Sequence, residues 1–143
     1  MKNLQKLLYK VRINSIYGNT NISIENLSYD SRNTKKNSIF FALEGKSFNG
    51  FNYIDESIKK GAIAILCDST PIKINKRLVY VIVEDVGEAL GIISSNFYDN
   101  PSSNIKLIGI TGTNGKTTSV TLLHNLFKDH NLSTGLISTI SIE

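Results

Sequence analysis

The chain has 143 residues, 41% of them hydrophobic and 20% charged, which suits one ordinary domain or a small domain with part of another. Apolar residues are spread along the whole length, so the composition excludes a disordered chain. The formal net charge of +4 suits an anionic ligand, but the basic residues form no long run, and we expect no binding to nucleic acid.

Secretion and membrane insertion are not expected either. The first residues carry charge but no long apolar core or small-residue cleavage site, so they do not resemble a secretory signal. No stretch approaches the roughly 20 apolar residues that span a bilayer. Cys67 is the single cysteine and lies in an apolar run, which favours a buried strand residue over a catalytic thiol. We therefore expect a cytoplasmic protein.

The first part of the chain begins with an amphipathic segment at Leu4 to Val11. Alternating apolar residues from Ile22 to Leu27 then predict a short strand that leads into Tyr29-Asp30-Ser31-Arg32. The run from Ser38 to Leu43 has the pattern of a buried strand, closed by a turn at Glu44-Gly45.

Helices and strands are expected to alternate from there to residue 98. Phe51 to Lys60 predicts a short helix, and Gly61 is suited to end it in a left-handed conformation. Two strands follow, at 62–67 and 78–83, and a longer helix is expected from Asp85, as its amino-terminal cap, to Tyr98. This alternation predicts an α/β fold with a largely parallel sheet.

A polar segment around Pro101 predicts a linker at 100–104 between domains at 1–99 and 105–143. After it we expect a strand at 105–111, a glycine loop, a helix at 116–130 and a strand at 135–140. Val120, Leu123 and Phe127 should form the buried stripe of that helix, with His124 as an ordinary helix residue. So short a unit cannot bury a core of its own, so the second domain looks truncated.

The strongest chemical pattern is the segment 109–118, Gly-Ile-Thr-Gly-Thr-Asn-Gly-Lys-Thr-Thr. It follows an apolar run and opens an amphipathic helix, which is the context of a phosphate-binding loop. Backbone N–H groups would surround phosphate oxygens, Lys116 would reach the outer phosphates as the catalytic residue, and Thr117 would bind Mg²⁺. The usual spacing places a glycine where Ile110 stands, so the pattern is a variant. The candidate ATP-binding residues are Gly112, Thr113, Asn114, Gly115, Lys116, Thr117 and Thr118.

This loop, from Thr111 to Thr118, resembles the ATP loop of the Mur ligase family, whose members carry the same variant spacing. Folylpolyglutamate synthetases have a similar loop but usually a further glycine after the lysine, where this chain has Thr117. The flanking segments 101–110 and 134–140 are similar to the third, tripeptide-forming branch of the family.

A second resemblance concerns residues 29–67, which are similar to the UDP-sugar-binding domain of the third and fourth Mur ligases. It is carried by Asp30-Ser31-Arg32, by 38–45, by 48–54 and by 60–62. The family usually has a histidine where Phe51 stands. The resemblance implies that Ser31 and the loop of Gly45, Lys46, Ser47 and Phe48 face the uridine. A local ion pair of Asp30 with Arg32, and turn geometry for Gly45 and Gly50, are the alternatives from the residues themselves.

As a whole, the resemblance implies part of an ATP- and Mg²⁺-dependent ligase of peptidoglycan synthesis. In the family, ATP phosphorylates a carboxylate of UDP-MurNAc-L-Ala-D-Glu, and the amine of diaminopimelate or lysine attacks the acyl phosphate. The alternatives are the fourth ligase of the family, a non-catalytic UDP-sugar or nucleotide-binding module, and an unrelated phosphate-loop kinase or nucleotidase. The sequence does not say which amino acid is added or how many copies assemble. We expect this chain by itself to be inactive.

Overall fold

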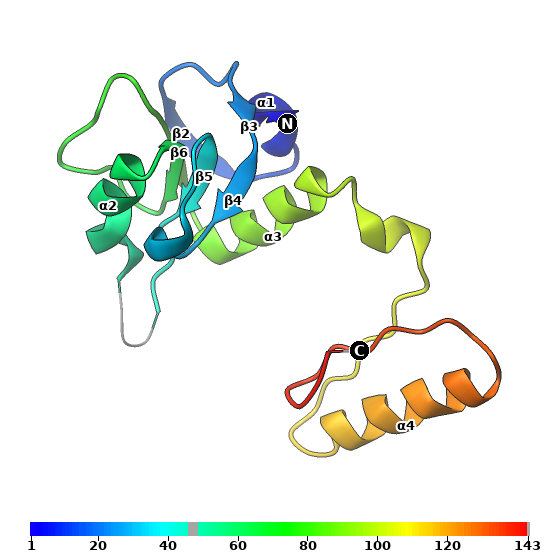
Figure 1. Cartoon of the computed structure of the whole chain (residues 1–143). Helices are drawn as coiled ribbons and strands as arrows, with labels where there is room; N and C mark the ends of the chain where they lie inside the picture. Colours follow the sequence, from blue (N-terminus) through cyan, green and yellow to red (C-terminus); the bar gives the residue numbers. More distant parts are fainter. Residues whose placement is uncertain (46–48, 143) are drawn as a thin grey trace. The chain divides into compact units, whose positions relative to one another are not determined.

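The computed structural model describes residues 1–45 and 49–142 and divides into two compact units (Figure 1). One unit comprises Met1–Asn104 and the other Ile105–Glu143. We describe each unit by itself.

The first unit is built on a five-stranded sheet with the order β2-β7-β6-β5-β4. Four neighbouring strands are parallel, and β2 pairs antiparallel with β7 at one edge. The predicted α/β class with a mainly parallel sheet is therefore confirmed. The strands of this sheet are β2 (Ile13–Tyr17), β4 (Asn26–Ser28), β5 (Ser38–Phe41), β6 (Ala62–Cys67) and β7 (Val79–Val83).

The single strand expected around Ile22 to Leu27 is in fact two strands, so that prediction was wrong. β3 (Ser23–Ile24) pairs with β1 (Lys2–Asn3) in a separate two-stranded sheet, whereas β4 joins the main sheet. Between β3 and β4 the backbone N–H of Glu25 donates to the carbonyl oxygen of Asn37 at 2.9 Å. Alternating apolar residues do not reveal this change of partner.

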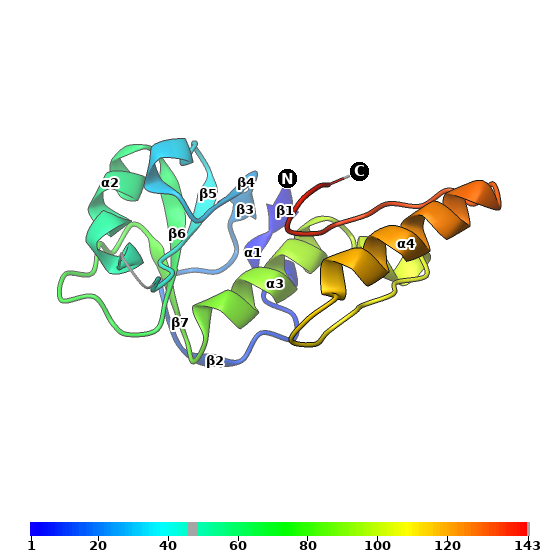
Figure 2. The same cartoon turned by 90° about the horizontal axis from the view of Figure 1, so that it is seen from below.

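Helices α1 (Leu4–Leu7) and α3 (Val86–Phe97) cover one face of the main sheet (Figure 2). Asp85 caps α3 as expected, because its carboxylate accepts from the backbone N–H of Glu88 at 2.9 Å. The helices and the sheet share one apolar core, in which Ile39, Phe41, Leu66, Val81 and Ile93 are fully or almost fully buried. Residues two apart on each strand point to this face.

Helix α2 (Ile54–Lys59) covers the opposite face, so helices lie on both sides of the sheet. It continues the 3₁₀ helix η2 (Gly50–Tyr53) and ends before Gly61, whose φ of 109° is the left-handed conformation expected there. Its core includes Phe40, Tyr80 and Cys67. Cys67 is buried at the end of β6, which confirms the interpretation of a buried strand cysteine, and this burial raises the pKa of its thiol to about 12.

The polar segment before the second unit is more ordered than a plain linker. Asp99 and Asn100 both have positive φ, and the 3₁₀ helix η3 (Pro101–Asn104) follows. The side-chain hydroxyl of Ser95 donates to the side-chain oxygen of Asn100 at 3.0 Å, so the turn is tied to α3.

The second unit consists of α4 (Lys116–Asp129) and extended segments on either side of it. The helix is where the sequence places it, but the strands predicted at 105–111 and 135–140 are not formed, so that prediction was wrong. An isolated bridge joins Ile137 and Ile142 instead. A strand needs a neighbour to satisfy its N–H and C=O groups, and no described residue supplies one to segment 105–111.

The core of the second unit is small, as its length predicted. Val120, Leu123 and Phe127 are only half-buried, whereas Leu136 and His124 are buried. The ring nitrogen Nδ1 of His124 lies 3.2 Å from the hydroxyl of Thr134, so this histidine joins the helix to the segment that follows it. None of the helices formed by the described residues is long and apolar enough to cross a membrane.

Candidate functional site

The carboxyl-terminal ends of β4 and β5 lie side by side, and each is followed by a segment predicted to bind uridine. Ser31 belongs to the 3₁₀ helix η1 (Ser31–Asn33), shortly after β4, and Gly45 follows β5. Ligands of open α/β sheets bind outside the carboxyl ends of parallel strands. The fold therefore brings Ser31 and Gly45 to the edge where a ligand is expected. Lys46, Ser47 and Phe48 lie outside the described residues.

The turn that carries Ser31 is organised by Asp30. Its carboxylate accepts from the backbone N–H of Arg32 at 2.9 Å and from the guanidinium of Arg32 at 2.7 Å. These hydrogen bonds from Arg32 lower the pKa of Asp30 to about 2. The local ion pair considered for Asp30 and Arg32 is therefore present, and it shapes the turn.

The hydroxyl of Ser31 already has a partner within the protein. It donates to Oε2 of Glu56 on α2 at 2.7 Å, and Ser31 is 5% exposed. The other carboxylate oxygen of Glu56 accepts from Nζ of Lys60, also at 2.7 Å. Sequence reasoning did not find Glu56, because nothing in the local pattern marks a contact 25 residues away.

The loop after β5 is closed at its base by two backbone contacts, and a side-chain cap follows on its far side. The backbone N–H of Gly50 donates to the carbonyl oxygen of Leu43 at 2.8 Å, and Glu44 forms a β-bridge with Asn49. The side chain of Asn49 accepts from the backbone N–H of Phe51 at 2.8 Å. These contacts fix both ends of the predicted uridine loop.

The predicted phosphate loop is an exposed turn at the start of α4. Gly112 has φ 148° and Gly115 has φ 77°, which are backbone conformations that residues other than glycine rarely adopt. A Cβ at Gly115 would meet no atom within 4 Å, so the space over the turn is open. Gly115 precedes α4 without any side-chain cap, which leaves backbone N–H groups of the first turn for an anion.

Two side chains of the predicted ATP loop have partners within the unit. Lys116 folds over the loop, and Nζ donates to the carbonyl oxygens of Gly112 and Thr113, the latter at 3.2 Å. The hydroxyl of Thr117 lies 3.3 Å from that of Thr139. Lys116 and Thr117 line a hollow of about 340 Å³ together with Ile110, Val120 and Ser138.

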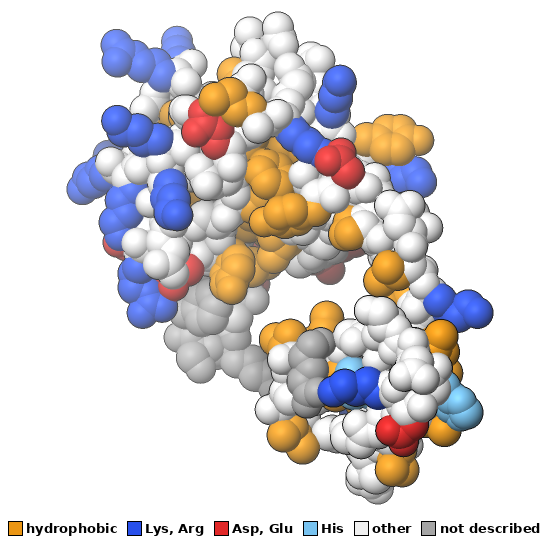
Figure 3. Space-filling view, turned by 45° about the vertical axis from the view of Figure 1, so that its right-hand side comes forward, with side chains coloured by type: hydrophobic (Ala, Val, Ile, Leu, Met, Phe, Trp, Pro, Cys, Tyr) orange, Lys and Arg blue, Asp and Glu red, His pale blue; other side chains and the backbone are white. Residues whose placement is uncertain are grey.

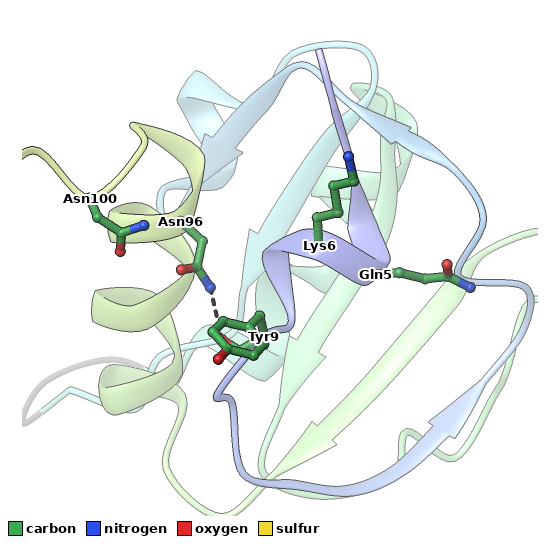
Figure 4. A pocket seen from close by; sticks show the side chains of 5 residues that line it. All are labelled: Gln5, Lys6, Tyr9, Asn96 and Asn100. Atoms are coloured by element: carbon green, nitrogen blue, oxygen red, sulfur yellow. Dashed lines mark hydrogen bonds between the residues drawn. The ribbon is translucent and has the colours of Figure 1, made fainter.

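A second hollow, of about 400 Å³, was not predicted (Figure 4). Gln5, Lys6 and Tyr9 line it from the amino-terminal segment, and Asn96 and Asn100 line it from the end of α3 and beyond. The Asn96 amide donates to the carbonyl oxygens of Leu7 and Tyr9 at 2.9 and 2.8 Å. This asparagine is therefore a structural link between α3 and the chain that leaves α1, and none of the predicted site residues lies here.

Positive charge gathers along one margin of the Met1–Asn104 unit in the space-filling view (Figure 3). Lys35, Lys36 and Lys59 are among the exposed basic residues of this unit. Such a margin attracts anions. Across the described ranges 1–45 and 49–142, no group of three or more His, Cys, Asp or Glu side chains is placed to hold a metal ion.

The profile of the Mur ligase family, catalytic domain, matches residues 23–98, from β3 to the end of α3. This chain belongs to the Mur ligase family. The predicted resemblance is thereby confirmed, and the match includes the turn at Ser31 and both ends of the loop after β5.

Curated members of the Mur ligase family match nearly the whole chain. The UDP-N-acetylmuramoyl-L-alanyl-D-glutamate–2,6-diaminopimelate ligase of Cytophaga hutchinsonii is 46% identical over 138 residues, which are 96% of this chain and 28% of that protein. The UDP-N-acetylmuramoyl-L-alanyl-D-glutamate–2,6-diaminopimelate ligase 1 of Clostridium acetobutylicum is 43% identical over 138 residues, which are again 96% of this chain and 28% of that protein. The chain thus spans little more than a quarter of these relatives.

Solved Mur ligases have the same fold. A diaminopimelate ligase of the family superposes with a TM-score of 0.72 at 20% identity, over 99% of this chain and 28% of that one. The MurF ligase of Thermotoga maritima, solved in complex with ADP, gives a TM-score of 0.54 at 27% identity, over 73% of this chain and 23% of that one.

Proposed function

We propose that this chain supplies the UDP-substrate-binding domain and the phosphate loop of an ATP-dependent ligase. The ligase would add diaminopimelate to UDP-MurNAc-L-Ala-D-Glu in peptidoglycan synthesis. The observation that carries the proposal is the 46% identity to a diaminopimelate ligase across 96% of the chain, which takes in both predicted sites. Lysine, the other amino acid that the sequence left open, has no such support.

In this proposal the first unit binds the uridine end of the substrate. Ser31 and Gly45 lie where adjacent parallel strands end, and Lys46, Ser47 and Phe48 complete the loop that the family resemblance assigns to uridine. The polar contacts around Leu43 and Gly50 hold the base of this loop.

The second unit would hold ATP as the co-substrate. The residues from Gly112 to Thr118 fit a polyphosphate, because the turn is exposed, the space over Gly115 is open and the helix that follows has no side-chain cap. Lys116 would exchange the carbonyl oxygens of Gly112 and Thr113 for phosphate oxygens. Its charge would stabilise the phosphoryl group during transfer. A reaction that consumes ATP supports the proposed cytoplasmic location.

Mg²⁺ would neutralise the charge that develops as phosphate moves to the substrate carboxylate. Thr117 fits this ion as a neutral oxygen ligand, since its hydroxyl is half-exposed and its contact with Thr139 at 3.3 Å is weak. The remaining ligands would include phosphate oxygens of the nucleotide. The described part of the chain offers no acidic cluster for this purpose.

A chimera tests the proposal. Residues 1–143 would replace the matching amino-terminal portion of the Cytophaga hutchinsonii ligase, and tripeptide product would be measured with ATP, UDP-MurNAc-L-Ala-D-Glu and diaminopimelate. We expect ligase activity that requires Lys116. A folded chimera that binds both nucleotides but forms no tripeptide would instead favour a binding module without catalytic function.

A further inference from the structure

Glu56 lies between Ser31 and Lys60, and both of its carboxylate oxygens are engaged. Oε2 accepts from the hydroxyl of Ser31, and Oε1 accepts from Nζ of Lys60, each at 2.7 Å. An ionised carboxylate can only accept hydrogen bonds, and a serine hydroxyl has one proton to give. The proton of Ser31 is therefore directed toward Glu56.

The charge on Glu56 is maintained by its surroundings. Hydrogen bonds from Lys60 and from Ser31 lower the pKa of Glu56, so the carboxylate is ionised at neutral pH. Lys60 is one helical turn beyond Glu56, where such pairs meet. Both side chains are partly exposed, so this arrangement lies at the surface of α2 next to the turn that carries Ser31.

The backbone of Ser31 is fixed as well as its hydroxyl. The preceding carbonyl oxygen, that of Asp30, accepts from the hydroxyl of Ser28 at 2.8 Å and from that of Thr34 at 3.3 Å. Both of these residues are buried. These hydrogen bonds hold the backbone next to Ser31, and while the hydroxyl proton points to Glu56, the two lone pairs of the Ser31 oxygen remain to accept a hydrogen bond.

We propose that Glu56, with the support of Lys60, is a positioning residue that makes the Ser31 hydroxyl a hydrogen-bond acceptor toward the nucleotide base. The inference rests on the proposed uridine site. Uracil carries an N–H at position 3 and can donate to this oxygen. Cytosine has an unprotonated nitrogen there, so two acceptors would oppose each other. The arrangement would thus select uridine over cytidine nucleotides.

The test compares binding of UDP and CDP to the full 143-residue chain by NMR titration. The wild-type chain should bind UDP about tenfold more tightly than CDP, the value of one well-placed hydrogen bond. In Glu56→Gln, the amide oxygen can pair with Lys60 while the amide N–H donates to Ser31. The Ser31 hydroxyl can then donate its proton to the base instead of to residue 56. The ratio of the UDP affinity to the CDP affinity should therefore fall toward one.

Asp55→Asn is the matched control, since it removes one negative charge from an exposed position of the same helix. It should keep the wild-type ratio. A folded Glu56→Gln variant with the wild-type ratio would overturn the inference. Should that variant not fold, UDP methylated at N3 tests the hydrogen bond that the inference requires with the wild-type chain, because methylation removes the N–H donor. Binding of this analogue as tight as that of UDP would also overturn the inference.

Failure of the proposed function has a different signature. If UDP does not bind, or if Ser31→Ala leaves the affinity for UDP unchanged, the uridine site itself is wrong, and the role of Glu56 is overturned with it. If Ser31→Ala weakens UDP binding but Glu56→Gln does not change the ratio, the uridine site stands and only the role of Glu56 is wrong.

Discussion

Gly50 lies against the backbone of Leu43 so closely that a Cβ at Gly50 would come within 2.6 Å of both the nitrogen and the oxygen of Leu43. The same two residues share a hydrogen bond of 2.8 Å. Atoms of a polypeptide backbone cannot move aside as a flexible side chain does. The glycine is therefore needed for close approach of two chain segments at the base of the proposed uridine loop.

Gly50→Ala should consequently destabilise the first unit by about 1–3 kcal/mol, as overpacking does. Denaturant unfolding followed by circular dichroism measures this difference. Gly91→Ala is the matched control, because a Cβ at this exposed position of α3 meets nothing within 4 Å. It should stabilise the helix by about 0.5–1 kcal/mol. Equal stability of the wild type and Gly50→Ala would contradict the observed packing.

The ion pair of Asp30 with Arg32 predicts a pH dependence. The pKa of Asp30 is about 2 in the folded chain because of the hydrogen bonds from Arg32, below the roughly 3.9 of an unfolded chain. A carboxyl group with a lowered pKa stabilises the fold above its unfolded pKa, and that contribution is lost as pH falls through the folded value. The stability advantage of the wild type over Asp30→Asn should therefore shrink between about pH 4 and pH 2.

Direct NMR titration of the Asp30 carboxyl group checks the cause. Arg32→Gln should return the pKa of Asp30 toward its ordinary value, because the guanidinium that donates to the carboxylate is gone. A midpoint near pH 4 in the wild-type chain would show that the pair does not form in solution.

Lys116→Ala tests the phosphate loop. In the chimeric ligase, the substitution should abolish turnover and leave the fold intact, because Lys116 is exposed and its hydrogen bonds within the described residues go to the loop carbonyls of Gly112 and Thr113. Lys128→Ala, in the last turn of the same helix, removes the same charge far along α4 and should keep turnover. Near-normal turnover of Lys116→Ala would remove this loop from the mechanism.

The 143-residue chain by itself should form no tripeptide from ATP, UDP-MurNAc-L-Ala-D-Glu and diaminopimelate. It spans 28% of the length of the relatives it matches, and Thr117 is the metal ligand that we propose in its phosphate loop. Phosphate release and chromatography of the product measure the activity. Detectable tripeptide would mean that the remaining three quarters of the relatives' length are dispensable for the reaction.

Local patterns in the sequence predicted most of the first unit. Apolar runs marked β5, β6 and β7, Asp85 marked the start of α3, and Gly61 marked the end of α2. The strands predicted at 105–111 and 135–140 failed because apolar character alone does not supply a pairing partner. The contact of Ser31 with Glu56 was missed for a similar reason, since it depends on how α2 packs beside η1.

The candidate sites differ in how far sequence could define them. The Asp30–Arg32 pair is local and was foreseen as an alternative, and the phosphate loop has a recognisable order of residues. Gly50 was expected to serve turn geometry, whereas its closest neighbours belong to Leu43 and Ala42, seven or eight positions earlier. Such contacts form when a loop closes. The order and spacing of residue types along the chain do not predict them.

The most direct test of the account is a titration of UDP-MurNAc-L-Ala-D-Glu into the 143-residue chain, followed by ¹⁵N–¹H NMR. If the first unit binds the uridine end of the substrate outside β4 and β5, the amide signals of Ser31 and Gly45 should shift first. The hollow beside Gln5 and Asn96 serves as an internal control and should not respond. Shifts confined to that hollow, or to other regions away from Ser31 and Gly45, would contradict the central claim.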